Sequence, residues 1–544
     1  MTNDPHAASR RAFLKGGSIA VTAVASVLAA GVEAQTPPPR PAAGLGGSTD
    51  GPVFAVAETA HGKVQGIVNA GVREFKGVPY GASTGGRNRF MPPKKPVAWT
   101  GARDCVGHGQ ICPQTPADLR SEYAQMIMWD QHVVGGMGED MLHLNVWTPG
   151  VDGAKRAVLV SFHGGGWATG SGNGPMYDGA NLARFGDVVV VTVNHRLASF
   201  GYTHLAGLGA PAEFAHAGVC GLMDMVASLE WVRDNIAGFG GDPGRVMVFG
   251  QSGGGSKTST LLATPSAKGL FHRAAVQSGS TLKLQTEEQA AKSADLLLRQ
   301  LGLGKSNIAD IQKVSWQRLL EAQTAAAGAN FAPVVGNSVL PHHPFDPVAP
   351  AESADVPVII STTLEDAALR LTNFDLDEAG LHEVIAKAYP GKADEILALY
   401  RRADPYKSPY LIQAQVLTDA GGRKNAIIQG ERKAALGRAP AYMYIWEWAT
   451  PAYDGKFGAV HGHDVDASFH IYRSNMTGSG SKAGRAMCDR LAGAWVAFAK
   501  TGDPNNTHLP HWPAYDGASR ATMMFDNDTR VENDPRGEMR KYWA

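Results

Sequence analysis

The chain has no excess of charge of either sign and very few cysteines. Its 50 lysine and arginine residues balance its 50 aspartate and glutamate residues, so bulk charge would not hold a nucleic acid or an anionic membrane. Four cysteines among 544 residues are too few for a disulfide scaffold, and their spacing matches no metal-binding motif. Beyond the N-terminus, no apolar run is long enough to cross a bilayer. These absences favour a globular enzyme with a large core.

The N-terminus carries a predicted export signal. Arg10 and Arg11 precede an apolar stretch over residues 19–30, and small residues then lead to a signal-peptidase site at the end of residues 1–34. This segment resembles a bacterial twin-arginine signal, which exports folded protein, and the alternative is an amphipathic or disordered N-terminus. Residues 35–52, rich in Pro, Gly and Ala, predict a flexible linker. We therefore expect a periplasmic or secreted protein with no membrane span after cleavage.

The cysteines divide into two predicted groups. In an oxidising compartment Cys105 and Cys112 are close enough in sequence to pair across a short loop. Cys220 and Cys488 are expected to remain buried thiols.

The rest of the chain, residues 53–544, is predicted to form one large α/β domain. Short β-branched runs alternate with longer helical patterns, which is typical of a mostly parallel sheet flanked by helices. The predicted central strands are 157–162, 188–193, 246–249 and 356–360. The predicted helices are 221–236 and 484–500, with 287–301 and 308–322 forming an inserted helical cap between two core strands. Catalytic groups in such open sheets collect at strand ends.

A candidate nucleophile follows one of these strands. The segment Gly250-Gln251-Ser252-Gly253-Gly254 comes directly after the strand 246–249 and before a helix start. Glycines that flank the serine remove the Cβ atoms that would clash in a sharp strand-to-helix turn, so the hydroxyl is exposed at its tip. A flexible glycine loop is the alternative, and the strand and helix context favours Ser252 as a nucleophile.

A glycine run after the neighbouring predicted strand indicates an oxyanion hole. His163, three glycines and Trp167 directly follow the strand 157–162. Successive glycines let backbone amides approach a substrate oxygen that side chains would obstruct. A phosphate cradle is the alternative, but no Gly-Lys-Ser/Thr follows. The predicted donors are the amides of Gly165, Gly166 and Gly253, and Trp167 is a candidate for lining the pocket.

Several further segments, in order along the chain, resemble the type-B carboxylesterase family, the cholinesterase-like branch of the α/β-hydrolases. They are residues 75–81, 89–90, 138–149, 235–243, 498–504 and 512–516. The resemblance covers nearly everything from Val53 onward. It implies the α/β-hydrolase fold, a deep active-site gorge, and hydrolysis of carboxylic esters through an acyl-enzyme.

The resemblance also implies the partners of Ser252. The family's triad histidine lies in a Gly-x-x-His-Gly segment, which places His461 as the general base. The family's acid follows a Val-Pro-containing strand, and an ungapped register places Asp366 on that position with Glu365 one residue before it. Either carboxylate is able to orient the imidazole, and the register favours Asp366. His463 forms an H-x-H pair with His461, but no third metal ligand is apparent, so a partly exposed loop histidine is favoured.

Three departures from the family pattern, and one match, concern the site and its surroundings. Gln251 stands where the family has Glu, which removes a buried charge, and Gly253 replaces Ala, which predicts an intact oxyanion amide in a looser turn. Arg89 and Glu139 match a buried ion pair of the family and are interpreted as structural. Met141 stands where the family often has a cysteine, so the family's early disulfide is not expected.

The predicted reaction is ester hydrolysis with a small-molecule substrate and no metal or organic cofactor. A non-catalytic binding protein on the same scaffold, or an amidase or lactonase with the same machinery, are the alternatives. Residues 114–138 are expected to form a loop over the gorge, and their Tyr123, Met126, Met128 and Trp129 either line the pocket or pin the loop.

Overall fold

The computed structural model describes residues 53–116 and 120–544. The predicted signal over residues 1–34 and linker over residues 35–52 lie outside the described residues. The described residues fall within one compact unit. Among them, no helix combines the length and the apolar character that crossing a bilayer requires.

The strands that the structure describes form one thirteen-stranded sheet. They are β1 (Phe54–Thr59), β2 (Gly62–Asn69), β3 (Val72–Pro79), β4 (Ala102–Asp104), β5 (His143–Thr148), β6 (Arg156–Phe162), β7 (Val189–Val193), β8 (Gly241–Gln251), β9 (Arg273–Gln277), β10 (Val358–Thr363), β11 (Ala441–Trp446), β12 (Ala521–Phe525) and β13 (Arg530–Asn533). Their order is β1-β2-β3-β5-β7-β6-β8-β9-β10-β11-β12-β13, with β4 beside β2. From β7 to β12 every neighbouring pair is parallel, the remaining pairs in this order are antiparallel, and β4 pairs with β2 in parallel.

The central strands are apolar at successive positions because helices cover both faces of the sheet. Val189 and Val191 of β7 belong to one core cluster, and Val188 and Val190 belong to another on the opposite face. Successive side chains of a strand point to opposite faces, so a continuous run of valines fills both cores.

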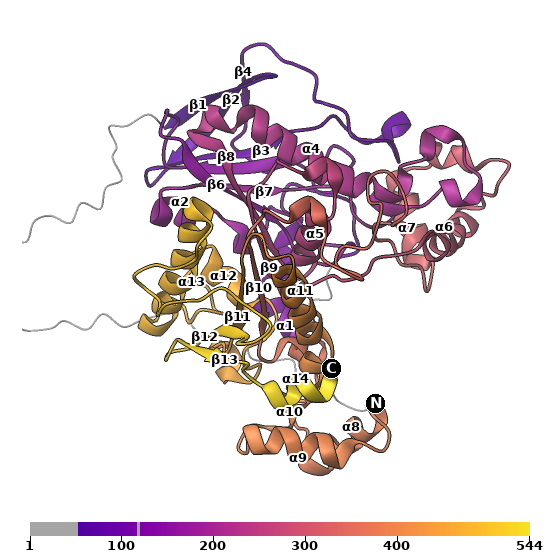
Figure 1. Ribbon diagram of the computed structural model, residues 1–544. Coiled ribbons are helices and arrows are strands. Elements are labelled where there is room, and N and C mark those ends of the chain that lie inside the picture. Colours follow the sequence, from indigo (N-terminus) through magenta and orange to yellow (C-terminus); the bar gives the residue numbers. More distant parts are fainter. Residues whose placement is uncertain (1–52, 117–119) are drawn as a thin grey trace, which may run out of the picture. The chain divides into compact units, whose positions relative to one another are not determined.

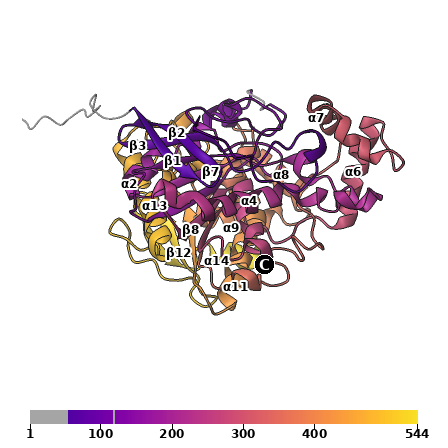
Figure 2. The same cartoon turned by 90° about the horizontal axis from the view of Figure 1, so that it is seen from above.

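The described α-helices lie on the two faces and in two insertions. They are α1 (Glu122–Met126), α2 (Ala180–Gly186), α3 (Ala198–Tyr202), α4 (Cys220–Asn235), α5 (Gly253–Leu262), α6 (Glu287–Leu301), α7 (Trp316–Ala325), α8 (Glu378–Ala388), α9 (Ala393–Ala403), α10 (Pro409–Thr418), α11 (Lys424–Ala435), α12 (His463–Ser468), α13 (Lys482–Thr501) and α14 (Gly537–Trp543). Helices α4, α5 and α11 contribute to one core cluster, and α2, α12 and α13 to the other. Figures 1 and 2 both show α6 and α7 at the end away from α2 and α13.

Most predicted elements are confirmed, with shifted ends. The strands predicted at 157–162 and 188–193 are β6 and β7, whereas the one predicted at 246–249 extends in both directions as β8. The strand predicted at 356–360 begins and ends later, as β10. The helices predicted at 221–236, 484–500 and 287–301 are α4, α13 and α6. A second helical insertion, α8 to α11 between β10 and β11, was not predicted.

The region predicted as helical over residues 308–322 is confirmed as helical, but in two pieces. The structure has a 3₁₀ helix at Ile308–Lys313 and then α7, which starts after Ser315, whose side chain accepts a hydrogen bond from the Arg318 amide. Arg89 causes part of the break, because its Nη1 donates to the carbonyls of Ile311, Gln312 and Val314, which a continuous helix would use internally.

Arg89 and Glu139 form the predicted ion pair. Their side chains are joined by two hydrogen bonds of 2.6 and 2.7 Å, and Arg89 is buried. The pair therefore fixes the first insertion to the segment before β5, as expected of a structural pair.

The four cysteines are free and buried. The predicted pairing of Cys105 with Cys112 is not formed. The Cys112 sulfur instead accepts a hydrogen bond from the Leu197 amide at 3.2 Å, and burial raises the pKa of Cys105 to about 12. The expectation that Cys220 and Cys488 are buried thiols is confirmed.

Removing Arg89 should destabilise the fold. We expect Arg89→Met to lower the free energy of unfolding by about 3 kcal/mol, because the largely buried Glu139 carboxylate would lose its partner. The control is Arg318→Met, which breaks an exposed pair with Glu321 and should change stability by about 0.5 kcal/mol or less. Urea denaturation measures both, and equal effects of the two substitutions would contradict the structural role of Arg89.

Candidate active site

The predicted site residues meet at one edge of the sheet. Strands β6, β8, β9, β10 and β11 are parallel neighbours, so their carboxyl ends lie along the same edge. The glycine segment follows β6, Ser252 follows β8, Asp366 follows β10, and His461 lies in the segment after β11. In open α/β sheets this edge is where ligands bind.

Ser252 occupies a strained turn between β8 and α5. Its φ of 60° and ψ of −123° lie in a region that residues with a side chain rarely adopt. Two backbone hydrogen bonds hold it there, from the Ser252 amide to Gln277 at 2.8 Å and from the Ser256 amide to Ser252 at 3.0 Å. The turn leaves the serine partly exposed at the strand end, as the sequence predicts.

The glycines around Ser252 allow a close approach to β6. A Cβ built on Gly250 or on Gly254 would collide with the carbonyl oxygen of Phe162, the last residue of β6. Any larger residue at either position would push the turn away from the neighbouring strand. The glycines therefore set how near Ser252 lies to the segment that follows β6.

Gly253 lies in close contact with the glycine segment after β6. A Cβ on Gly253 would collide with the backbone of Gly166, so the start of α5 packs directly on the glycine segment. This close packing places the Gly166 backbone against the first residue of α5, whose amide is the third predicted donor. Trp167, beside Gly166, is half-buried and lies edge-on to Tyr202, with 5.3 Å between ring centroids.

Hydrogen bonds with residues beside the three glycines fix the orientation of the peptide planes in this segment. The Gly164 amide donates to the Tyr177 hydroxyl at 2.9 Å, the Gly164 carbonyl accepts from His163 Nδ1 at 2.8 Å, and the Gly165 carbonyl accepts from the Thr169 amide at 3.0 Å. The carbonyls of Gly164 and Gly165 belong to the same peptides as the amides of Gly165 and Gly166. Because the C=O and N–H of a trans peptide point in opposite directions, these two amides point away from the residues that hold the carbonyls.

The three predicted donors are available. No residue in the described part of the chain accepts a hydrogen bond from the amides of Gly165, Gly166 or Gly253. Gly253 is the first residue of α5, where helical amides have no partner within the helix.

His461 pairs with Asp366. The distance from His461 Nδ1 to Asp366 Oδ1 is 2.6 Å, and the Thr363 hydroxyl donates to the same oxygen at 3.1 Å. Burial alone would lower the pKa of His461, but the charge and hydrogen bond of Asp366, with the charge of Asp464, raise it above 6.5. Among the described residues, His461 Nε2 forms no hydrogen bond, and Gly462 packs against the Gln251 side chain. The imidazole is thus oriented by a carboxylate, and the residue that follows it lies near the residue that precedes Ser252.

Glu365 points elsewhere and holds the histidine segment. Its Oε1 accepts hydrogen bonds from Lys407 at 2.6 Å and from Gln415 at 2.8 Å, and its Oε2 accepts from the Ala459 amide at 2.8 Å. Its own amide donates to the Ala459 carbonyl. Of the two adjacent carboxylates, Asp366 reaches the imidazole, and Glu365 fixes the backbone that carries it.

His463 is fully buried, which corrects the expectation of a partly exposed histidine. Its Nδ1 accepts a hydrogen bond from the Trp446 indole at 3.1 Å and its Nε2 donates to the Met476 carbonyl at 2.8 Å. Burial lowers the pKa of His463 to about 4, so the ring is neutral. Among the described residues, no group of three or more His, Cys, Asp or Glu is placed to hold a metal ion.

In the predicted loop over the gorge, residues 120–138 contain helix α1 and contact the segment that carries His461. Tyr123, on α1, donates its hydroxyl to the His461 carbonyl at 2.9 Å. Met126 is buried in a cluster that includes Val460, and Trp129 packs against the same cluster, with its ring tilted against that of His132. These contacts favour the pinning role for Tyr123, Met126 and Trp129.

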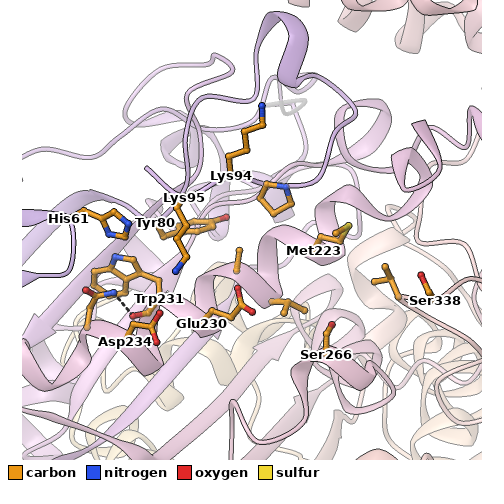
Figure 3. Close-up of a pocket in the computed structure, with 15 residues that line it drawn as sticks. His61, Tyr80, Lys94, Lys95, Met223, Glu230, Trp231, Asp234, Ser266 and Ser338 are labelled. Carbon is orange, nitrogen blue, oxygen red and sulfur yellow. Dashed lines mark hydrogen bonds between the residues drawn. The ribbon is translucent and has the colours of Figure 1, made fainter. Parts of the chain in front are cut away.

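A separate cavity of about 320 Å³ lies beside α4 (Figure 3). Its lining includes Lys94 and Lys95 on one side and Glu230 and Asp234 of α4 on the other. None of the predicted site residues lines this cavity, so it is distinct from the edge that carries Ser252.

Sequence reasoning missed several supports of this arrangement. Tyr177 accepts a hydrogen bond from the Gly164 amide, Thr363 donates to Asp366, and Lys257 donates to the His163 carbonyl. No sequence pattern marks Tyr177 or Thr363, and Lys257 is distinguished only by its position shortly after Ser252.

Comparison with known proteins places the chain among esterases. Residues 54–543 match the sequence model of the Carboxylesterase family. The chain is 33% identical over 504 residues to a para-nitrobenzyl esterase of Bacillus subtilis, covering 89% of this chain and 98% of that protein. It is 30% identical to a phenmedipham hydrolase of Pseudarthrobacter oxydans, covering 87% and 95% of the two chains.

A solved structure agrees with these relatives. The carboxylesterase EST55 of Geobacillus stearothermophilus superposes with a TM-score of 0.77 at 33% identity, covering 90% of this chain and 100% of that one. The α/β-hydrolase fold expected from the sequence is thereby confirmed.

The division between the two carboxylates predicts different stabilities. We expect Glu365→Ala to lower the melting temperature more than Asp366→Ala, because it leaves Lys407, Gln415 and the Ala459 amide without their acceptor. Differential scanning calorimetry of the two variants measures this. A larger loss for Asp366→Ala would contradict the structural role of Glu365.

Proposed function

The chain belongs to the carboxylesterase family and is a carboxylic ester hydrolase, and on that premise we propose that Ser252, His461 and Asp366 act as its catalytic triad. The observation that carries the proposal is the 2.6 Å hydrogen bond between His461 and Asp366 at the edge where the strained Ser252 turn lies. The order along the chain, from glycine segment to Ser, acid and His, is that of α/β-hydrolases.

The reaction proceeds in two halves. Ser252 Oγ attacks the ester carbonyl while His461 Nε2 takes its proton, and Asp366 holds the Nδ1–H tautomer and stabilises the imidazolium. The amides of Gly165, Gly166 and Gly253 donate to the oxyanion. His461 then returns the proton to the departing alcohol, and water, activated by the same imidazole, hydrolyses the acyl-enzyme. None of these steps uses a group other than the chain, the ester and water.

The cellular location of the enzyme stays a prediction. Residues 1–34 carry the pattern of an exported protein, and we propose that the enzyme acts in the periplasm or outside the cell. Fractionation of cells that express the full chain tests this, and activity found in the cytoplasm with uncleaved protein would contradict it.

Replacing the nucleophile should abolish hydrolysis. We expect Ser252→Ala to lower kcat for short p-nitrophenyl esters and for a p-nitrobenzyl ester, the class named for one relative, by about 10⁴-fold or more. The control is Ser228→Ala, because Ser228 is a buried serine of α4 that bonds only to the Met225 carbonyl among the described residues. Retained activity in Ser252→Ala would overturn the assignment, and faster cleavage of the matching p-nitroanilides would favour an amidase.

The pH dependence should report the His461–Asp366 pair. The base works when neutral, and its pKa is raised above 6.5, so kcat/KM should fall as pH drops through an inflection above that value. Asp366→Asn should lower kcat by up to about 10⁴-fold and move the inflection to lower pH, because the carboxylate no longer stabilises the imidazolium. A pH–rate profile of both proteins measures this, and an unmoved inflection would contradict the pairing.

A further inference from the structure

Helix α5 carries a buried lysine directly behind the glycine segment. Lys257 is fully buried, and its Nζ donates to the His163 carbonyl at 2.8 Å. The same Nζ lies 5.9 Å from the centre of the Trp167 ring. His163 and Trp167 flank the three glycines, so one ammonium group contacts the residue at each end of the segment.

We propose that Lys257 is a positioning residue of the oxyanion hole, which ties the glycine segment to the nucleophile helix and places a positive charge behind it. This inference rests on the proposed function of Ser252. The hole takes amides from two pieces of chain, Gly165 and Gly166 after β6 and Gly253 at the start of α5. Lys257 belongs to the second piece and bonds to the first, so it fixes the distance between them.

The hydrogen bond of Lys257 acts on a single peptide plane. The His163 carbonyl and the Gly164 amide belong to the same peptide, and Lys257 holds one end while the Tyr177 hydroxyl holds the other. That plane precedes the two planes whose amides face the site. A rotation at His163 would therefore move both donors of the glycine segment.

In the part of the chain that the structure describes, the charge of Lys257 has no local counterion. Among the described residues, no carboxylate pairs with it, and its surroundings include His163 after β6 and His195 after β7, which stack with 5.0 Å between centroids. Burial, with the charge of Lys257, lowers the pKa of both histidines well below 6.5, so they stay neutral. A buried cation beside neutral rings is costly for stability, and it favours the state in which negative charge develops nearby.

The lysine should titrate within the working range of the enzyme. Burial lowers the pKa of Lys257 to about 7. The protonated form supplies the charge, so stabilisation of an oxyanion should decrease as pH rises through that value. His461 sets the acidic side of the activity profile, and Lys257 sets a basic side.

The test compares Lys257→Met with a matched control. Lys433→Met removes another buried lysine, on α11, whose Nζ donates to the carbonyls of Ser353 and Ala354 at 2.9 and 2.8 Å. Native enzyme and both variants are assayed with p-nitrophenyl butyrate and with a trifluoromethyl ketone, whose adduct with the serine places an oxyanion in the hole. Thermal unfolding of each variant records the structural cost.

We expect Lys257→Met to lower kcat about tenfold or more, to weaken the ketone by a similar factor, and to change KM by less than about threefold. The basic side of its pH profile should disappear. Lys433→Met should keep native kcat and ketone affinity even where its melting temperature falls. Native kcat and ketone affinity in Lys257→Met, or equal losses in the two variants that follow their melting temperatures, would overturn the proposal.

A second measurement uses the native enzyme alone, so it does not depend on whether the variants fold. In the native enzyme, ketone affinity should fall as pH rises through about 7, and an affinity that stays constant to about pH 9 would overturn the role of the charge. Ser252→Ala separates the two hypotheses. Loss of ester hydrolysis in Ser252→Ala supports the proposed function, whatever the result for Lys257. A native enzyme that hydrolyses no ester would reject the proposed function itself.

Discussion

The site depends on how closely α5 approaches the end of β6. Gly250 and Gly254 leave no room for a Cβ against the Phe162 carbonyl, and Gly253 leaves none against Gly166. This contact fixes Ser252 in a backbone conformation that residues with side chains rarely adopt, and it puts amides from two pieces of chain side by side. The Tyr177 hydroxyl holds the Gly164 amide of one piece, and the buried Lys257 of α5 bonds to the His163 carbonyl across the two pieces.

The acid loop shows how two neighbouring carboxylates are separated by geometry. Both follow β10 directly, yet Asp366 reaches the His461 ring and Glu365 reaches the backbone that carries His461. The Lys407 ammonium pairs with Glu365, so that this buried carboxylate has a counterion of its own. A positioned imidazole thus depends on both side chains, through different contacts.

Sequence patterns predicted the strands and turns that depend on neighbouring residues in the chain. Runs of β-branched residues gave the central strands, and the glycines around Ser252 and after β6 predicted close turns that the structure contains. Resemblance to a family, rather than spacing, brought His461 and Asp366 together. The failures came from distant contacts. Arg89 binds carbonyls of residues 311–314 and so divides the predicted helical region over 308–322 into two pieces, and Lys257 is buried where two pieces of chain far apart in sequence meet.

The measurement that tests the central claim most directly is covalent labelling with a fluorophosphonate. An activated serine oxygen attacks the phosphorus of the reagent and displaces fluoride. The product is a stable phosphonyl ester on that serine, which takes the place of the tetrahedral intermediate. Mass spectrometry of the digested protein should find one adduct per chain, on Ser252, formed more slowly in Asp366→Asn and absent from Ser252→Ala. An adduct on another serine, or none in a preparation that hydrolyses esters, would contradict the account.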